Sequence, residues 1–297
     1  MNKERSEVMR CRLNSTGNFG KQLKRLMQSI NEEIALALLH ACRVPETGVH
    51  EARKSCKEVR ALLRLIRPQI GKTEYSRRQD HYKTISGKLS GSRDAAVRVK
   101  TWRELIKENA ALQEQRYDAI DRFLSEQQKL NTLEVKGREF FMELALEVEA
   151  QSAAPKEWDL PKSLSTLMPN LKLIYQNARY AEKKANSSDE IEAFHQFRKR
   201  SKDLFYCLRV LRPMLGKGLK SKINKLEVMT ELQGLANDQA VLLEYLADHR
   251  HEIDLDDEQW DLAEACIVAK LQALQKQTHK LAKRLLSDSP ASFIKSL

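Results

Sequence analysis

The sequence predicts an all-α fold, and three observations support this prediction. Gly and Pro are scarce, at 10 and 7 of 297 residues, while the helix-favouring residues Leu, Ala, Lys, Glu and Gln dominate. Apolar residues recur at spacings of three and four in nearly every window, and no clear alternating run of the kind expected for a strand occurs. A related segment also appears twice, which indicates two similar halves.

The repeated segment is GVHEARKSCKEVRALLRLIRPQIG at residues 48–71 and AFHQFRKRSKDLFYCLRVLRPMLG at residues 193–216. Aligned from His50 and His195, the copies share His, Arg, Lys, Lys, Leu, Arg, Arg, Pro and Gly at a constant offset of 145 residues. This offset is close to half the chain, so it favours two similar halves over a solenoid of short units. We therefore expect domains at residues 1–152 and 153–297, divided near the proline-containing stretch AQSAAPKEWDLPKS.

In the first half, a helix is expected from Phe19 to Ala41, because apolar residues form one side of it. Pro45 ends this helix, since the residue before a proline disfavours helix. The basic segment then forms the next helix, which stops at Pro68 and Gly71. Further helices are expected over Glu74–Ser90 and Ser92–Lys107, and the charged stretch Asn109–Ala150 is expected to form an exposed hairpin or one extended helix.

The second half repeats this plan. Helices are expected over Leu164–Ala185, the second basic segment, Leu219–Leu232, Ala236–His249 and Asp256–Leu286. The Arg93–Asp94 pair of the first half has Asn237–Asp238 as its counterpart, at an offset of 144 residues. Both aspartates are most simply interpreted as N-terminal caps of helices, although carboxylates of this kind also orient nearby cations.

On a helical wheel at about 100° per residue, the cations of each basic segment gather on one side. The stripe of the first segment, roughly 100° wide, holds His50, Arg53, Lys57, Arg60, Arg64 and Arg67, with Lys54 beside it. The stripe of the second segment holds His195, Arg198, Lys202, Arg209 and Arg212, with Lys199 beside it. The opposite faces are apolar and are expected in the core: Val59, Leu62, Leu63 and Ile66 in the first copy, and Leu204, Cys207, Leu208 and Leu211 in the second.

Cations stacked on one helix face repel one another, so such a stripe needs an explanation. A single stripe is more often a solvated face than a site, but two stripes at matching positions favour a site for a linear polyanion. The net charge of +11 and the pI near 9.4 agree with an acidic partner, such as nucleic acid, an anionic membrane or another polyanion. A soluble, helix-rich surface explains the basic composition alone equally well.

Cysteine usage and the absence of targeting signals indicate the compartment. Five cysteines without a C-x-x-C pair favour buried thiols in a reducing environment over disulfides or a zinc site. The polar start MNKERSEVMR is unlike a secretory signal, and no apolar run of about 18 residues is present to span a bilayer. We therefore expect a cytoplasmic protein with no membrane insertion.

The chain resembles the CHAD family, the conserved histidine α-helical domains, over nearly its whole length. The matching segments are VHEARKSCKEVRALLRL and LSGSRDAAV in the first half, and IYQNARYAEKKA, FHQFRKRSKDLFYCLRVL and LQGLANDQAVLLEYL in the second. The resemblance implies two four-helix bundles related by a pseudo-twofold, with the basic helices facing a central basic channel. It also implies that inorganic polyphosphate binds in this channel, so polyphosphate granules are one location to expect for the protein.

The resemblance assigns ligand contacts residue by residue. The implied polyphosphate-binding residues are His50, Arg53, Lys54, Lys57, Arg60, Arg64 and Arg93 in the first half, and Tyr175, Arg179, His195, Arg198, Lys199, Lys202 and Arg209 in the second. The wheel adds Arg67 and Arg212 to this set. Two positions depart from the repeat, because Phe205 stands where the first copy has Arg60, and Asn237 stands where it has Arg93.

An enzyme is not expected. The sequence contains no G-x-x-x-x-G-K-[ST] phosphate loop, no H-E-x-x-H and no G-x-S-x-G. Phosphoryl transfer also needs carboxylates to hold magnesium, and the basic stripes offer none. We therefore expect a binding protein without a cofactor or a metal.

Nucleic acid is the main alternative partner, because a basic stripe alone does not distinguish one phosphate backbone from another. Single-strand binders usually add aromatic side chains on which bases stack. Aromatic residues make up only 6% of this chain, and the first basic segment contains none, so a chain of bare phosphates fits better. A membrane-surface role ranks third, because the apolar faces are needed in the core. Phosphate storage, granule attachment and signalling all stay open as the cellular role.

Overall fold

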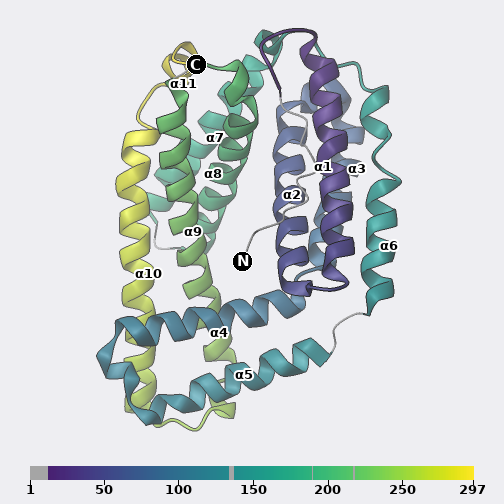
Figure 1. Cartoon of the computed structure of the whole chain (residues 1–297). Coiled ribbons are helices and arrows are strands. Elements are labelled where there is room, and N and C mark those ends of the chain that lie inside the picture. Colours follow the sequence, from purple (N-terminus) through teal and green to yellow (C-terminus); the bar gives the residue numbers. More distant parts are fainter. Residues whose placement is uncertain (1–12, 134–136, 189, 217) are drawn as a thin grey trace, which may run out of the picture.

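The computed structural model describes residues 13–133, 137–188, 190–216 and 218–297 of the chain (Figure 1). Every regular element within these residues is a helix, which confirms the all-α prediction. The α-helices are α1 (Phe19–Ala41), α2 (Pro45–Leu65), α3 (Arg67–Lys88), α4 (Gly91–Glu108), α5 (Asp118–Leu133), α6 (Arg138–Glu149), α7 (Met168–Asn186), α8 (Ile191–Leu211), α9 (Leu219–Asp248), α10 (Asp257–Leu285) and α11 (Pro290–Lys295). The 3₁₀ segments are η1 (Ala110–Gln113), η2 (Gln115–Tyr117), η3 (Ala154–Glu157), η4 (Leu164–Leu167), η5 (Arg212–Met214) and η6 (Arg250–Glu252). No helix in this part of the chain has the length and apolar character needed to cross a membrane.

The helices form two groups that meet along α2 and α8 (Figure 1). Helix α2 packs against α1 and α3, and α6 packs against α1. Helix α8 packs against α7 and α9, and α10 lies along α9. One hydrophobic core runs through both groups, from Leu23 and Leu62 on one side to Phe197 and Leu274 on the other. The predicted halves therefore share a core across the α2–α8 contact, and the division near residue 152 stays a prediction.

A second, smaller core lies at one end of the molecule, where α4 and α5 reach the far ends of α9 and α10 (Figure 1). Trp102 and Ile120 from α4 and α5 are fully buried there against a group that includes Leu242 of α9 and Ala263 of α10. Helix α4 thus leaves the first group of helices and joins the second. This crossing matters for the site, because it brings α4 next to α9.

Local sequence explains where the helices begin. The Asn18 side chain accepts a hydrogen bond from the Lys21 N–H at the start of α1, and Asp256 forms a capping box with Gln259 at the start of α10. Pro45 stands at the start of α2, where its missing N–H costs nothing. Gly48 in the next turn allows close packing, because a Cβ there would lie 2.5 Å from the Ala37 carbonyl oxygen of α1.

Helix α3 begins earlier than the predicted start at Glu74. The basic helix α2 ends at Leu65, and α3 starts at Arg67 with Pro68 in its first turn. Gly71 then kinks the helix with φ of 77°, a left-handed conformation that glycine adopts without steric cost. The prediction that the basic helix stops at Pro68 and Gly71 is therefore wrong: α2 ends before both residues, and both lie within α3.

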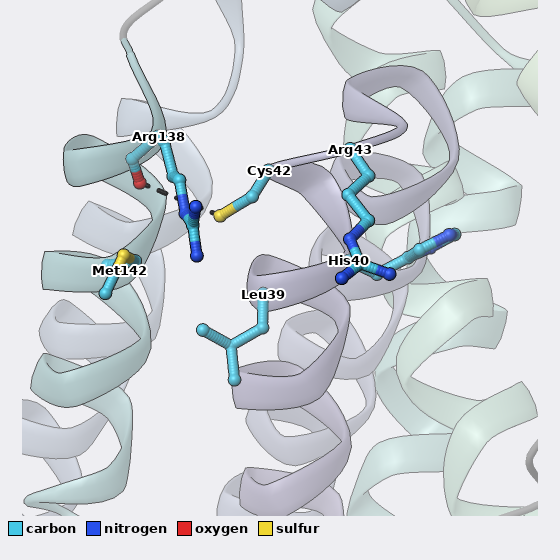
Figure 2. A pocket seen from close by; sticks show the side chains of 6 residues that line it. All are labelled: Leu39, His40, Cys42, Arg43, Arg138 and Met142. Carbon is cyan, nitrogen blue, oxygen red and sulfur yellow. Dashed lines mark hydrogen bonds between the residues drawn. The ribbon is translucent and has the colours of Figure 1, made fainter.

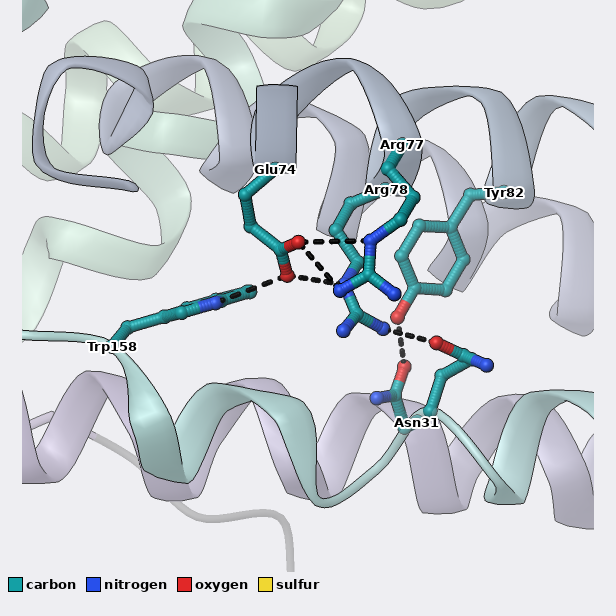
Figure 3. A network of polar contacts seen from close by, with 7 residues as sticks. Asn31, Glu74, Arg77, Arg78, Tyr82 and Trp158 are labelled. Carbon is teal, nitrogen blue, oxygen red and sulfur yellow. Dashed lines mark hydrogen bonds and ion pairs between the residues drawn. The ribbon is translucent and has the colours of Figure 1, made fainter. Parts of the chain in front are cut away.

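Polar contacts hold α3 against its neighbours (Figure 3). Glu74 accepts hydrogen bonds from Arg77, from Arg78 and, at 3.2 Å, from the Trp158 indole N–H. Burial alone would raise the pKa of Glu74, but these hydrogen bonds hold it below its ordinary value. The Tyr82 hydroxyl donates to Asn31 of α1 at 2.6 Å, so α3 is fixed to α1 and to the segment after α6.

The second-half prediction of two helices over Leu219–Leu232 and Ala236–His249 is wrong, because α9 is a single helix over both. Gly234 lies inside it, and one glycine in a helix costs only about 1 kcal/mol. Packing of α9 on α8, α4 and α10 offsets this cost. As a consequence, Asp238 lies within a helix and is not an N-terminal cap, while Asp94 lies in the first turn of α4, after the N-cap Ser90.

The stretch Asn109–Ala150 is neither one extended helix nor an exposed hairpin. It contains α5 and α6, which pack on different partners, α4 and α1 respectively. Phe123 and Leu124 of α5 belong to the second core, whereas Phe141 and Leu144 of α6 belong to the main one. Each helix therefore has an apolar face, which a count of charged residues alone did not reveal.

Candidate functional site

A cavity of about 670 Å³ lies between α2, α4, α8 and α9, and we call it the interhelical cavity. Helices α2 and α8 reach it through their polar faces because their apolar faces are committed to the core. Val59, Leu62, Leu63 and Ile66 are fully buried, as are Cys207 and Leu211, with Leu204 and Leu208 at 1–2% exposure, as predicted. The exposed side of each helix is therefore the side that carries the cations.

The interhelical cavity brings together eight of the sixteen residues predicted as ligand contacts. These are His50, Arg53, Lys54 and Lys57 from α2, and His195, Arg198, Lys202 and Arg209 from α8. They are mostly partly buried, so long side chains are supported by protein while their charged ends reach the cavity. Arg53 illustrates this support, because its guanidinium donates to the Ser86 carbonyl oxygen of α3 at 3.1 Å.

The remaining predicted residues lie elsewhere. Arg60 turns away, with its Nε–H donating to Gln79 Oε1 at 3.1 Å, and Arg67 is exposed with its guanidinium 5.0 Å from the centre of the Tyr75 ring. Tyr175 is fully buried, stacked on Phe293, and donates to the Asp288 carbonyl oxygen at 3.1 Å. Outside the cavity lining are also Arg64, Arg179, Lys199 and Arg212. The side chain of Arg93 lies outside the described residues.

Four carboxylates also line the interhelical cavity, although none of them belongs to the basic stripes of α2 and α8. Asp94 comes from α4, and Glu227, Glu231 and Asp238 come from α9. Sequence reasoning missed the two glutamates because they lie outside the repeated segment. In the described part of the chain, no three His, Cys, Asp or Glu side chains are grouped to hold a metal ion. The acids therefore make the cavity a site of mixed charge without forming a metal centre.

Arg98 of α4 is a further cation of the cavity that the motif did not reveal. Its guanidinium carbon lies 3.7 Å from the centre of the Tyr245 ring of α9, a cation–π contact that holds α4 to α9. The Arg98 Nε is buried and has no hydrogen-bond partner. Only the crossing of α4 to α9 brings this arginine to the site, so no local signal in the sequence could have found it.

His195 and Asn237 form a pair at the cavity wall. The His195 Nδ1 lies 3.1 Å from the Asn237 Oδ1, so Nδ1 carries the proton and Nε2 is left as the acceptor in the neutral ring. Burial, with a smaller contribution from Lys199, holds the pKa of His195 below its ordinary value. In this tautomer Nε2 therefore becomes a hydrogen-bond donor to an anion only when the ring is protonated.

Two ion pairs cross the contact between α2 and α8. Arg64 of α2 donates to the Asp203 carboxylate of α8 at 2.9 Å, and Arg209 of α8 pairs with the Glu58 carboxylate of α2. Burial raises the pKa of Asp203 despite the opposing effect of Arg64. Of the four residues, only Arg209 lines the interhelical cavity.

The aromatic rings of the cavity are covered. Phe205 and Tyr206 line it, but each is only 5% exposed. The Arg209 guanidinium lies over both rings, with its carbon 5.2 Å and 5.0 Å from their centres. The rings therefore support an arginine rather than present a free face.

A second hollow of about 410 Å³ lies between the end of α1 and the start of α6 (Figure 2). Its lining is partly apolar, with Leu39 and Met142, and partly basic, with Arg43 and Arg138. The Cys42 thiol donates to the Arg138 carbonyl oxygen at 3.7 Å. None of the predicted ligand residues lies here, so this hollow is unrelated to the repeated motif.

Fold and cavity together define an all-helical protein. Equivalent His, Arg and Lys side chains from the two repeated segments line a single cavity in it. The chain belongs to the CHAD domain family, whose family model matches residues 21–247. A CHAD domain is generally a binding domain rather than a catalytic one.

Solved structures support the fold. The CHAD domain from the plant Ricinus communis is similar over 91% of this chain and 94% of its own, with a TM-score of 0.59 and 15% identity. PptA from Streptomyces chartreusis is similar over 94% of this chain and 99% of its own, with a TM-score of 0.56 and 13% identity. Among curated protein sequences there is no match. Identities this low make the likeness one of fold.

Proposed function

We propose that the chain binds inorganic polyphosphate in the interhelical cavity and is not an enzyme. The observation that carries the proposal is the convergence of both motif copies, because His50, Arg53 and Lys57 share one cavity with His195, Arg198 and Lys202. Members of the CHAD family, which the sequence resembles and to which the chain belongs, are associated with polyphosphate binding. A basic lining alone would be weaker support than this matched pair of turns.

The charges of the cavity suggest where the phosphates lie. Seven lysine and arginine side chains line it against four carboxylates, so its field favours an anion. The acids lie on α4 and α9, whereas all the cations except Arg98 lie on α2 and α8. Since carboxylates repel phosphate, we place the bound chain along α2 and α8, with Arg98 as a contact from α4.

Nucleic acid is the competing ligand, and the aromatic side chains argue against it. Single-stranded nucleic acid gains much of its affinity from bases stacked on exposed rings. Phe205 and Tyr206 lie beneath Arg209, and the Tyr245 ring lies beneath Arg98. The cavity therefore offers charge without free ring faces, which suits a ligand that has phosphates and no bases.

The test is a titration with polyphosphates of defined length, against single-stranded DNA and RNA at matched phosphate concentration and at two salt concentrations. Polyphosphate is expected to displace the nucleic acids, and its affinity is expected to fall with salt as counterions are displaced. Displacement of polyphosphate by nucleic acid would overturn the proposal.

The proposal also includes a location and a division of the chain. We place the protein in the cytoplasm at polyphosphate granules, and microscopy of the tagged full chain with a granule stain tests this location. The chain is divided into two related halves at residues 1–152 and 153–297.

A further inference from the structure

The two ion pairs between α2 and α8 join equivalent residues of the repeated segment in opposite directions. Glu58 and Asp203 are 145 positions apart, and so are Arg64 and Arg209. Glu58 pairs with Arg209, and Arg64 pairs with Asp203. Each pair therefore joins the acid of one copy to the arginine of the other.

The order of contacts shows that the helices run antiparallel at this point. As the chain rises along α2 from Glu58 to Arg64, the partners fall along α8 from Arg209 to Asp203. Between the two ion pairs, the Cys207 thiol donates to the Ala61 carbonyl oxygen at 3.5 Å. This pattern is the one that a twofold axis between α2 and α8 would produce.

Both acids are buried, whereas both arginines are partly exposed. The side chains of Glu58 and Asp203 are 2% and 12% exposed, and those of Arg209 and Arg64 are 28% and 24% exposed. A buried carboxylate is costly to leave unpaired, so each acid fixes the guanidinium that reaches it. The two pairs are equivalent in sequence and similar in burial, although Asp203 also pairs with Arg200 of its own helix at 3.6 Å.

Their consequences for the site differ. Arg209 lines the interhelical cavity and rests on Phe205 and Tyr206, while Glu58 holds it from α2. Arg64 lies outside the cavity and also donates to the Arg60 carbonyl oxygen at 3.0 Å. One pair therefore presents an arginine to the site, and its counterpart serves only the contact between the helices.

We propose that Glu58 is a positioning residue for the ligand, which acts by holding Arg209 at the cavity wall, and that Asp203, its counterpart, has no such role. The proposal rests on polyphosphate binding in the interhelical cavity. It assigns a role in anion binding to a buried carboxylate, which by its charge alone would oppose the ligand.

The repeat supplies a matched control. Glu58→Gln and Asp203→Asn each remove one negative charge from the same contact. If charge alone mattered, both changes would strengthen polyanion binding. Positioning predicts instead that Glu58→Gln weakens polyphosphate binding by about tenfold, the effect of losing one good contact, while Asp203→Asn leaves it unchanged or slightly stronger.

Charge-conserving variants cover the case in which the amide variants fold poorly. Glu58→Asp keeps the charge but withdraws the carboxylate by one methylene, so it is expected to weaken binding. Asp203→Glu keeps the charge at the other pair and is expected to leave the affinity within about twofold, because its partner Arg64 is outside the cavity. Thermal unfolding of each variant shows which ones are folded at the temperature of the binding experiment.

A measurement without ligand separates this proposal from the proposed function. NMR of the arginine Nε–H groups in the full chain reports whether Arg209 is immobilised, and Glu58→Gln is expected to release it. If the wild type does not bind polyphosphate, the proposed function fails, while the NMR result still shows whether Glu58 holds Arg209. If the wild type binds and Glu58→Gln matches Asp203→Asn in affinity, or if Arg209 stays immobile in Glu58→Gln, the positioning role is overturned.

Discussion

Three pairs of equivalent residues in α2 and α8 are placed in the same way, whereas other equivalent pairs, such as Lys54 and Lys199, are not. His50, Arg53 and Lys57 and their counterparts in α8 all line the interhelical cavity. Further along, Arg209 lines the cavity while Arg64 does not, and Phe205 lines it while Arg60 turns to Gln79. Equal spacing in the sequence therefore gives equal placement only where the surroundings are also equal.

The surroundings differ because the helices that follow α2 and α8 differ. After α2 the chain forms α3, breaks at Leu89 and Ser90, and crosses as α4 to the other group of helices. After α8 the corresponding region is the continuous helix α9, held to α8 by a hydrogen bond from Gln233 to Ser201 at 3.2 Å. The cavity thus receives α4 from one half and α9 from the other, and both form walls of the same space.

The largest expected effect concerns the equivalent cations of α2 and α8 that line the same cavity. The double variants Arg53→Ala/Lys57→Ala and Arg198→Ala/Lys202→Ala are each expected to weaken polyphosphate binding about 100-fold, because two charge-assisted contacts are lost. The slope of log affinity against log salt is expected to fall by about 1.4, as for two phosphates no longer neutralised. The control is Arg67→Ala/Arg212→Ala, which removes the same charge outside the cavity. Equal losses in control and test variants would show that only net charge matters.

Arg64 should matter for stability and not for binding. Arg64→Ala leaves the buried Asp203 carboxylate with the more distant Arg200, at 3.6 Å, as its remaining ion-pair partner, and the free energy of unfolding at pH 7 is expected to fall by about 2 kcal/mol. The affinity for polyphosphate is expected to stay within about twofold of the wild type. Urea unfolding and the same titration measure the two quantities, and a tenfold loss of affinity would place Arg64 among the ligand contacts after all.

This loss of stability is expected to depend on pH. Burial raises the folded-state pKa of Asp203 even with Arg64 present, so the folded state binds the proton more tightly than the unfolded state does. Removal of Arg64 increases this difference, and the variant is therefore expected to regain stability as the pH falls from 7 to 5. Asp203→Asn in the Arg64→Ala background should abolish the regain, and a regain that persists would show that another group is responsible.

A smaller effect is expected at His195, which has a lowered pKa and holds Asn237 through Nδ1. The unfolded state binds the proton more readily, so the ligand-free protein should lose stability as the pH falls below about 6.5, the ordinary histidine value. Bound phosphate favours the protonated ring, and the affinity should therefore rise over the same range, by less than tenfold per pH unit for one proton. The variant His195→Gln should show a smaller rise in affinity than the wild type, because the contribution of His195 protonation is lost. Identical pH profiles of affinity for the two proteins would assign His195 a structural role.

The smallest effect on binding is expected for Tyr175, which the family resemblance included among the ligand contacts. Tyr175→Phe removes the hydrogen bond to Asp288 and is expected to cost about 1 kcal/mol of stability. Since the ring is fully buried against Phe293, the polyphosphate affinity should not change. A measurable loss of affinity in a fully folded variant would mean that the α7 side of the molecule contributes to the site.

The sequence by itself determined the helical class, the extent of α1 and α10 to within a residue or two, and the apolar and cationic faces of α2 and α8. These features depend on spacings of three and four residues and on local caps, so they are written in neighbouring positions of the chain. The same local information identified the turns that hold His50 and His195, because the repeat marks them twice.

Only the tertiary structure decided which cations share the cavity. Arg64 and Arg209 are indistinguishable by position in the repeat, and their ion-pair partners are equivalent as well. Their different placement follows from the helices that pack around α2 and α8, which differ between the two halves. The same holds for Arg98, Glu227 and Glu231, which reach the cavity only because α4 crosses to α9 and α9 does not break at Gly234. Contacts between distant segments depend on how whole helices pack, and a pattern of nearby residues carries no record of that packing.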